Sequence, residues 1–162
     1  MKVNIRKYRS SDRPSIVKCM EDFGNYLAAI DELKRTRLMP QYGEYFTQKL
    51  LENIHRNKGL IYVAEHEGRI VGFIGGIILR QSKADLLECI PSRDGRIIEL
   101  FVDAQYRGQN IGTMLMEKME DYFRKAECDL IKVEVFAPNV DAYRFYRKLG
   151  YSDRMFDLIK EL

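Results

Sequence analysis

Hydrophobic positions recur along the chain with two spacings, and the change from one spacing to the other marks the expected elements. Alternation over residues 3–8 predicts an edge strand. Apolar residues at helical spacing then predict two helices, which end near Ile30 and near Lys58. Residues 60–66 and 70–79 are rich in β-branched side chains and predict the two strands of a hairpin.

The second half of the chain predicts strands and helices in alternation. Residues 81–95 form a connection that is longer than a hairpin needs. The complete order, β-α-α-β-β-β-α-β-α-β, predicts the α/β class (an α+β mixed sheet), antiparallel through the hairpin and parallel where a helix crosses between strands. The elements expected in this half are a strand at 96–102, a helix at 110–127, a strand at 130–136, a helix at 140–149 and a final strand at 155–159.

Length and composition exclude several classes of function. The 162 residues predict one domain, residues 1–162, and contain 46% hydrophobic and 31% charged residues, as soluble globular proteins do. A net charge of +3 is too mild to indicate a nucleic-acid partner. No apolar stretch approaches the roughly 20 residues that a membrane helix requires. The N-terminus lacks a secretory pattern and the three cysteines are scattered, so we expect a cytoplasmic protein without a metal site.

The segment from Ile97 to Thr113 carries the clearest chemical signal. An apolar run ends in a glycine-containing turn at 107–112, and a helical pattern starts at once. Such a turn exposes the first N–H groups of a helix at the positive end of its dipole, which favours an anion and above all a diphosphate. The turn lacks the ending of nucleoside-triphosphate loops and the third glycine of the dinucleotide fingerprint. On this pattern alone, an ordinary strand-to-helix connection remains the alternative.

A second segment, residues 139–151, lies downstream, and together the two segments resemble the GNAT superfamily of acyl-CoA-dependent N-acetyltransferases. The first is similar to the family's pyrophosphate loop, Q/R-x-x-G-x-G/A, with Arg107, Asn110 and Gly112 on the motif positions. Asn110 stands where the family usually has Gly, and Asn is the residue other than glycine that best tolerates a left-handed backbone. The second is similar to the family's N-x-x-A-x-x-F-Y-x-K-x-G-F/Y segment, matched at Asn139, Ala142, Phe145, Tyr146, Lys148, Gly150 and Tyr151.

The resemblance covers residues 96–151 and implies a GNAT-like three-layer fold, with a central mixed sheet of six or seven strands flanked by helices. It also implies that acetyl-CoA is the co-substrate, that its pantetheine arm pairs with the fourth strand, and that its diphosphate lies on the turn. Asn139 additionally caps helix 140–149. The residues to which the resemblance gives coenzyme contacts are Leu100, Phe101, Val102, Arg107, Gly108, Gln109, Asn110, Ile111, Gly112, Thr113 and Asn139.

Two side chains are the candidates for catalysis. The resemblance places Tyr146 near the thioester sulfur, where its phenol can protonate the departing thiolate; a core tyrosine is the alternative. Many family members carry Glu four residues before Leu100, where this chain has Arg96, and Glu99 is the only carboxylate inside the strand. Strict alternation puts Glu99 on the face opposite to Leu100 and Arg96 unless a bulge shifts the phase. Glu99 is therefore a candidate base or water-holder, and a solvated or ion-paired strand acid is the alternative.

The favoured function is an N-acetyltransferase that moves an acetyl group from acetyl-CoA to a primary amine by direct attack in a ternary complex. A catalytically silent acyl-CoA-binding module is the alternative. The acceptor is a small molecule or a peptide, and a polyamine, an aminoglycoside-like amine and a protein N-terminus all stay open; a homodimer is compatible with the sequence. The loops at 31–42 and 81–95 carry acids that either attract a cationic acceptor or are plain surface, namely Asp31, Glu32, Asp85 and Glu88.

Overall fold

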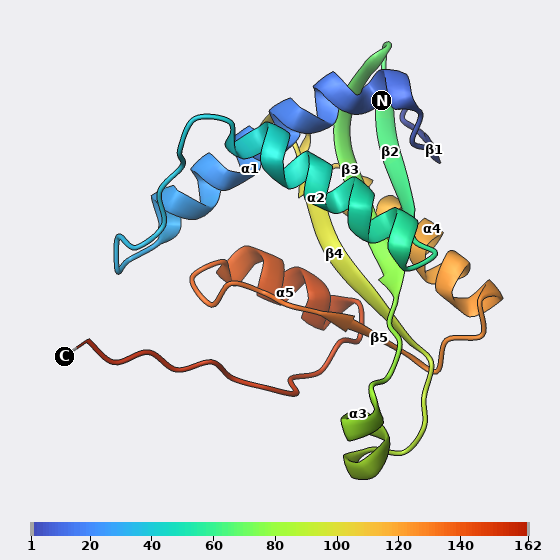
Figure 1. The fold of residues 1–162 in the computed structure, drawn as a ribbon. Helices are drawn as coiled ribbons and strands as arrows, with labels where there is room; N and C mark the ends of the chain where they lie inside the picture. The colour runs from blue at the N-terminus through green and yellow to red at the C-terminus, as the bar shows by residue number, and fades with distance from the viewer. Residues whose placement is uncertain (1, 162) are drawn as a thin grey trace.

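A five-stranded sheet with the order β1-β2-β3-β4-β5 runs through the molecule. The computed structural model describes residues 2–161, and Figure 1 shows α1 and α2 crossing one face of the sheet while α4 lies behind it. The elements are β1 (Asn4–Lys7), α1 (Arg13–Ile30), α2 (Tyr42–Arg56), β2 (Leu60–His66), β3 (Arg69–Ile78), α3 (Lys83–Glu88), β4 (Asp94–Val102), α4 (Ile111–Lys125), β5 (Leu130–Val133) and α5 (Val140–Lys148), with short 3-10 turns at Ser10–Asp12 and Ala104–Tyr106.

The pairing of the strands confirms the predicted fold class. Strands β1 to β4 pair antiparallel with their neighbours, and β5 pairs parallel with β4 after the crossover through α4. The hairpin between β2 and β3 turns on Glu67 and Gly68, which both have positive φ, at 49° and 76°. A two-residue turn of this kind matches the twist of the flanking strands, which explains why so short a connection suffices.

Two hydrophobic clusters cover the two faces of the sheet. We call these faces the α1/α2 face and the α4 face. Apolar side chains of α1 and α2 pack on the first with Phe73 and Phe101, and one side of α4 packs on the second together with Tyr146 of α5. The helical spacing of the buried residues therefore places both helical layers as predicted. The buried helix residues are Ile16, Cys19, Met20, Leu50, Ile111, Leu115, Met116, Met119 and Phe123.

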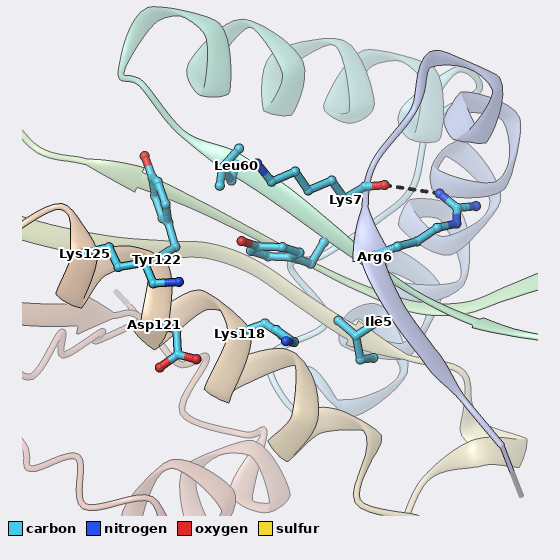
Figure 2. Close-up of a pocket in the computed structure, with 9 residues that line it drawn as sticks. Ile5, Arg6, Lys7, Leu60, Lys118, Asp121, Tyr122 and Lys125 are labelled. Atoms are coloured by element: carbon cyan, nitrogen blue, oxygen red, sulfur yellow. Dashed lines mark hydrogen bonds between the residues drawn. The ribbon is translucent and has the colours of Figure 1, made fainter.

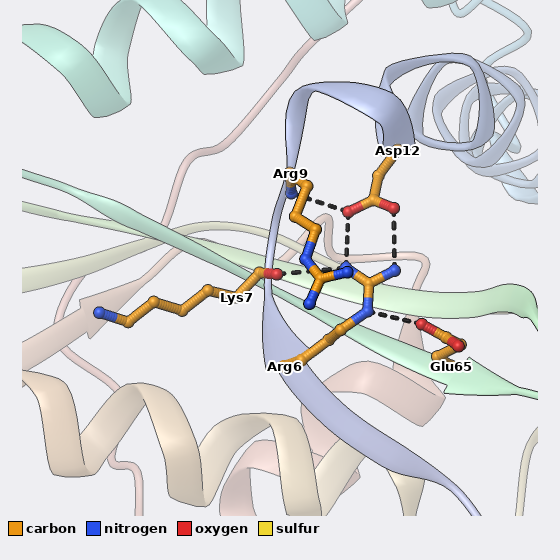
Figure 3. A network of polar contacts seen from close by, with 5 residues as sticks. All are labelled: Arg6, Lys7, Arg9, Asp12 and Glu65. Atoms are coloured by element: carbon orange, nitrogen blue, oxygen red, sulfur yellow. Dashed lines mark hydrogen bonds and ion pairs between the residues drawn. The ribbon is translucent and has the colours of Figure 1, made fainter.

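A charged network fixes the edge strand β1 to the start of α1 (Figure 3). The Arg6 guanidinium donates to both carboxylate oxygens of Asp12, at 2.8 and 2.9 Å, and its Nε donates to Glu65 at 2.5 Å. Asp12 also accepts from the backbone N–H of Arg9 at 2.8 Å. These charge-assisted bonds join β1, β2 and the turn before α1, which the short strand β1 needs because it has a partner on one side only.

The predicted closing strand at 155–159 is wrong for this structure. Residues 151–161 run without a strand partner, and the described sheet has five strands rather than six or seven. The alternation of apolar residues there reflects strand propensity, but a strand also needs an edge to pair with. The long connection at 81–95 contains the short helix α3, whose Ser82 and Asp85 form a capping box that the sequence prediction missed.

Candidate active site

Strand β4 leaves its neighbour β5 halfway along its length. The pairing covers only Asp94 to Ile97 on β4, although β4 continues to Val102. We call residues 98–102 the open edge, because no described strand pairs with them on the β5 side. Apart from Val102 C=O, which accepts from the Arg107 side chain, their N–H and C=O groups on that side are available to an extended ligand, as in strand addition.

Two cross-strand ion pairs hold β4 and β5 together up to the point where they separate. The buried carboxylate of Asp94 pairs with Lys132 at 2.6 Å and accepts from the Ser92 hydroxyl at 2.6 Å. Arg96 pairs with Glu134. These contacts join the first three residues of β4 to the end of β5, so they stop where the open edge begins.

A β-bulge at Ile98 sets the direction of Glu99. Ile97 pairs with Gly76 and Glu99 pairs with Gly75, so Ile98 is one extra residue on β4. A Cβ on Gly75 would contact Leu50 of α2, and directly paired residues share a face. Glu99 therefore projects from the α1/α2 face, whereas unbroken alternation would have placed it on the α4 face with Ile97.

Glu99 is a half-buried carboxyl group held near two phenols. Burial alone raises its pKa to about 7. Its charge is close enough to raise the pKa values of Tyr42 and Tyr146, although burial is the larger cause in both. Tyr42 begins α2 and Tyr146 lies in α5, so three segments far apart in the sequence converge at the open edge. Sequence reasoning missed Tyr42, which no local motif marks.

Tyr146 is both a core residue and a member of this site. It is 7% exposed and packs edge-to-face against Phe145 and Tyr151. Within residues 2–161 its hydroxyl makes no hydrogen bond. The hydroxyl oxygen is not fully enclosed by protein atoms. The two interpretations of Tyr146 from the sequence are therefore compatible, and the phenol is free to contact a bound molecule.

The turn at 107–112 has the geometry of an anion site. Gly108 and Asn110 have φ of 74° and 64°, so Asn110 does adopt the left-handed conformation in the place where the family usually has Gly. The first backbone bond of α4 runs from Met114 N–H to Asn110 C=O at 3.0 Å, and no side chain caps the helix. The N–H groups of residues 111–113 consequently lack helical acceptors and can donate to a phosphate.

Gly112 has a packing role in addition to its place in the motif. A Cβ at this position would lie 3.3 Å from Cζ of Phe145 and 4.0 Å from Cγ2 of Val102. The missing side chain therefore lets the start of α4 approach α5 and the end of β4. Gln109 also stabilises the turn, because its side-chain amide donates to Gln105 C=O at 3.3 Å.

Tyr26 of α1 connects the turn to the start of α5. The Arg107 guanidinium lies 4.7 Å from the centre of the Tyr26 ring, and its Nε donates to Val102 C=O at 3.1 Å. The Tyr26 hydroxyl donates to Oδ1 of Asn139 at 3.1 Å, and the same oxygen accepts from Ala142 N–H at 3.3 Å, which makes Asn139 the cap of α5. Sequence reasoning predicted this cap but missed Tyr26, because α1 carries no motif.

Two of the four loop acids are committed to their own backbone and are poor candidates for binding a cation. Asp31 is buried and accepts from the N–H groups of residues 33, 35 and 36, at 3.1, 2.9 and 2.6 Å. Asp85 accepts from Ser82 N–H at 2.6 Å within the capping box. The exposed Lys34 and Arg37 follow Asp31 in this loop, together with one exposed acid, Glu32.

A groove of about 600 Å³ lies between β1, β2 and α4 (Figure 2). It shares no residue with the open edge, the turn at 107–112 or Tyr146. It is open to solvent and combines lysines with one acid, and it contains neither a half-buried carboxyl group nor an uncapped helix start. The open edge is therefore the candidate site. The lining residues are Ile5, Arg6, Lys7, Leu60, Tyr62, Lys118, Asp121, Tyr122 and Lys125.

Within residues 2–161, no helix is long and apolar enough to cross a membrane. In the same residues, no cluster of three or more His, Cys, Asp or Glu side chains has the arrangement of a metal site.

Comparisons with known proteins agree with this geometry. The sequence model of the Acetyltransferase (GNAT) family matches residues 27–151. An uncharacterized N-acetyltransferase of Methanocaldococcus jannaschii is 34% identical over 93% of this chain and 78% of its own. The aminoalkylphosphonate N-acetyltransferase of Salmonella typhimurium is 31% identical over 88% of this chain and 86% of its own.

The fold is also similar to that of solved acetyltransferase structures. Glucosamine-6-phosphate N-acetyltransferase of Arabidopsis thaliana superposes with a TM-score of 0.70 at 21% identity, over 99% of both chains. The family match covers most of the sequence and includes the open edge, the turn and α5. The chain belongs to the GNAT family, and it is an acetyl-CoA-dependent N-acetyltransferase.

Proposed function

We propose that the protein transfers the acetyl group of acetyl-CoA directly to a primary amine in a ternary complex. The observation that carries this proposal is the convergence, at an unpaired strand edge, of a half-buried carboxyl group, a free phenol and an uncapped helix start. Acyl transfer to an amine needs a proton acceptor, a group that stabilises the leaving thiolate, and a fixed coenzyme. The open edge supplies a candidate for each.

The coenzyme is placed by backbone groups. In our proposal the pantetheine arm pairs with Leu100, Phe101 and Val102 as an added strand, and the diphosphate accepts from the N–H groups of residues 111–113. Support comes from the missing β5 partner along 98–102 and from the missing cap on α4. A backbone N–H on the open edge would then also face the thioester carbonyl, where one such donor is typically worth on the order of 10²–10³ in rate.

Glu99 is the proposed base. The amine nitrogen attacks the thioester carbon, the C–S bond breaks as the amide C–N bond forms, and the proton lost by nitrogen passes to Glu99 directly or through a water. A carboxyl group whose pKa is about 7 can accept a proton near neutral pH and release it again to solvent. No ion pair neutralises Glu99 within the described residues, which argues against a purely structural strand acid.

Tyr146 is the proposed partner of the leaving thiolate. Burial, with the charge of Glu99 as the smaller cause, raises its pKa and keeps the phenol protonated throughout the working range. A phenol that is this weakly acidic does not readily surrender its proton to a thiolate whose conjugate acid has a pKa of about 8.5. Its main contribution is then a hydrogen bond to the developing negative charge, with the proton shared as the C–S bond breaks.

The loop before α2 indicates an acceptor that carries an anionic group beside its amine. Lys34 and Arg37 are exposed on this loop, and Asp31 is used by the backbone. One relative is named an aminoalkylphosphonate N-acetyltransferase, a substrate class that combines an amine with a phosphonate. Polyamines lack the anion that would use these cations, and they are the weaker candidates.

Release of free thiol from acetyl-CoA tests both the enzyme and its acceptor. The panel should contain an aminoalkylphosphonate, a polyamine, an aminoglycoside and a peptide with a free N-terminus, and calorimetry should measure acetyl-CoA binding in parallel. We expect amine-dependent thiol release that is fastest with the phosphonate. Tight coenzyme binding without thiol release for any amine would instead support the silent acyl-CoA-binding module.

A further inference from the structure

Tyr26 is a half-buried residue of α1 that contacts two segments of the candidate site at once. The Arg107 guanidinium lies over its ring, with 4.7 Å between the guanidinium carbon and the ring centre. Its hydroxyl donates to Oδ1 of Asn139 at 3.1 Å. Arg107 begins the turn at 107–112, and Asn139 caps α5. Tyr26 belongs to neither of the two motifs, so neither motif assigns it a role.

The Tyr26 ring and the end of β4 hold the Arg107 side chain between them. The planar guanidinium stacks on the aromatic ring while its Nε donates to Val102 C=O at 3.1 Å. Its Nη groups make no hydrogen bond within residues 2–161, so they remain available beside the N–H groups of the turn. A guanidinium can donate two parallel hydrogen bonds to a phosphate, so this arrangement suits a diphosphate.

The Tyr26 hydroxyl fixes the orientation of the Asn139 amide. Oδ1 of Asn139 accepts from this hydroxyl and from Ala142 N–H at 3.3 Å. An amide oxygen has two lone pairs, so both are occupied. The Nδ2 group has no hydrogen-bond partner among the described residues. It is therefore available to donate to a molecule bound at the start of α5.

We propose that Tyr26 is a positioning residue for acetyl-CoA. Its ring holds Arg107 for the diphosphate and its hydroxyl holds Asn139 for the pantetheine arm, so both side chains are in place before the coenzyme arrives. The inference rests on the proposed placement of the coenzyme along the open edge and the turn. Arg107 is exposed, and an unrestrained arginine would lose rotamer freedom when the coenzyme binds, which weakens affinity. The contact with Tyr26 removes much of this loss in advance.

Two substitutions separate the ring of Tyr26 from its hydroxyl. Tyr26→Leu removes both contacts, and we expect the calorimetric dissociation constant of acetyl-CoA to rise about 10-fold. Tyr26→Phe keeps the ring over Arg107, and the expected rise is about threefold, from the lost hydrogen bond alone. At saturating acetyl-CoA and amine, kcat should stay within about twofold of the parent for both variants, so the change appears in KM for acetyl-CoA. A purely structural tyrosine would not divide its effects in this way.

Tyr122, which lines the groove in Figure 2, supplies the matched control. It is also a half-buried tyrosine of a helix, and its hydroxyl donates to Lys58 C=O. Tyr122→Phe and Tyr122→Leu therefore remove the same groups as the two Tyr26 variants at a position that shares no contact with the turn or with α5. They should leave the dissociation constant of acetyl-CoA unchanged, even where they lower the Tm.

A double-mutant cycle tests whether the ring acts through Arg107. Arg107→Gln removes the cation and introduces the other residue that the motif allows at this position. In this background Tyr26→Leu and Tyr26→Phe should weaken acetyl-CoA binding equally, by about threefold, because only the hydroxyl contact is left to lose. In an Asn139→Asp background, which keeps the oxygen that caps α5 and removes Nδ2, Tyr26→Phe should have no effect on binding.

The role of Tyr26 and the site of the coenzyme can fail separately. A loss of about 10-fold for Tyr26→Leu in both the parent and the Arg107→Gln background overturns the role of Tyr26. Unchanged affinity in Tyr26→Leu, when Arg107→Gln weakens binding, overturns that role as well and leaves the coenzyme site intact. If neither Arg107→Gln nor Asn110→Val weakens binding, the diphosphate does not lie on the turn, and the proposed coenzyme site fails together with the role of Tyr26.

Discussion

Replacing Glu99 by Gln should stabilise the protein while it removes activity. The folded structure raises the pKa of this carboxyl group from 4.5 to about 7 by burial. Below about pH 4.5 the group is neutral in both the folded and the unfolded chain, and it has no effect on stability. As the pH rises from 4.5 to 7, the unfolded chain releases the proton first, so the free energy of unfolding falls. Above pH 7 the accumulated loss is about 3 kcal/mol.

Gln has nearly the same shape as Glu and cannot ionise, so Glu99→Gln removes this loss. We expect the free energy of unfolding to rise by up to about 3 kcal/mol at pH 8 and to change little at pH 4. Urea denaturation at both pH values measures the difference. Glu117→Gln, at an exposed position of α4, is the matched control and should show no such dependence on pH.

The activity of the same variant should depend on pH in the opposite sense. At pH 8 the base is lost and kcat/KM should fall by about 10²–10⁴-fold. Below pH 7 the parent carboxyl group is itself protonated, so the gap between the parent and Glu99→Gln should narrow. Thiol release at saturating acetyl-CoA measures kcat/KM of the parent and of the variant at each pH. An unfolding difference that is equal at pH 4 and pH 8 would refute the buried-carboxyl argument, and unchanged kcat/KM would assign Glu99 to structure.

Substitutions at three further positions test separate parts of the structure. Tyr146→Phe should lower kcat about 100-fold and leave calorimetric acetyl-CoA affinity unchanged; full activity would make Tyr146 a core residue only. Asn110→Gly should bind acetyl-CoA as well as the parent or better, whereas Asn110→Val should weaken it, because a β-branched residue resists the φ of 64°. Asp12→Asn should cost about 1.5–3 kcal/mol in urea denaturation at pH 7. Arg6 lowers the pKa of Asp12, so this cost should persist above the usual Asp pKa and disappear as the pH falls through the lowered value.

Local sequence signals predicted the elements that local interactions determine. The hairpin turn at Glu67 and Gly68 and the left-handed Asn110 both follow from backbone preferences of single residues, and both are present. The cap of α5 also has a local signal. Asn139 was predicted to cap this helix, and it does. The missed helix α3 also had a local signal, the Ser82 and Asp85 box, inside a stretch interpreted as a connection.

Features that depend on distant partners could not be predicted. The bulge at Ile98 arises from the register between β4 and β3, which no single segment specifies. Tyr26 and Tyr42 reach the site from α1 and from the start of α2, and neither has a motif. Residues 155–159 show the converse case, because their composition favours a strand but they pair with no edge of the described sheet.

The position of the bulge explains how a half-buried carboxyl group can serve the open edge. Without the extra residue, Glu99 would share the face of Ile97 and point at α4, where a Cβ on the paired Gly76 already meets Met119 and Phe123. With Ile98 inserted, the pairing of β4 with β5 ends and Glu99 turns to the α1/α2 face within the same two residues. In the proposed function, the open edge receives the coenzyme, and the same irregularity directs the proposed base toward the site of attack.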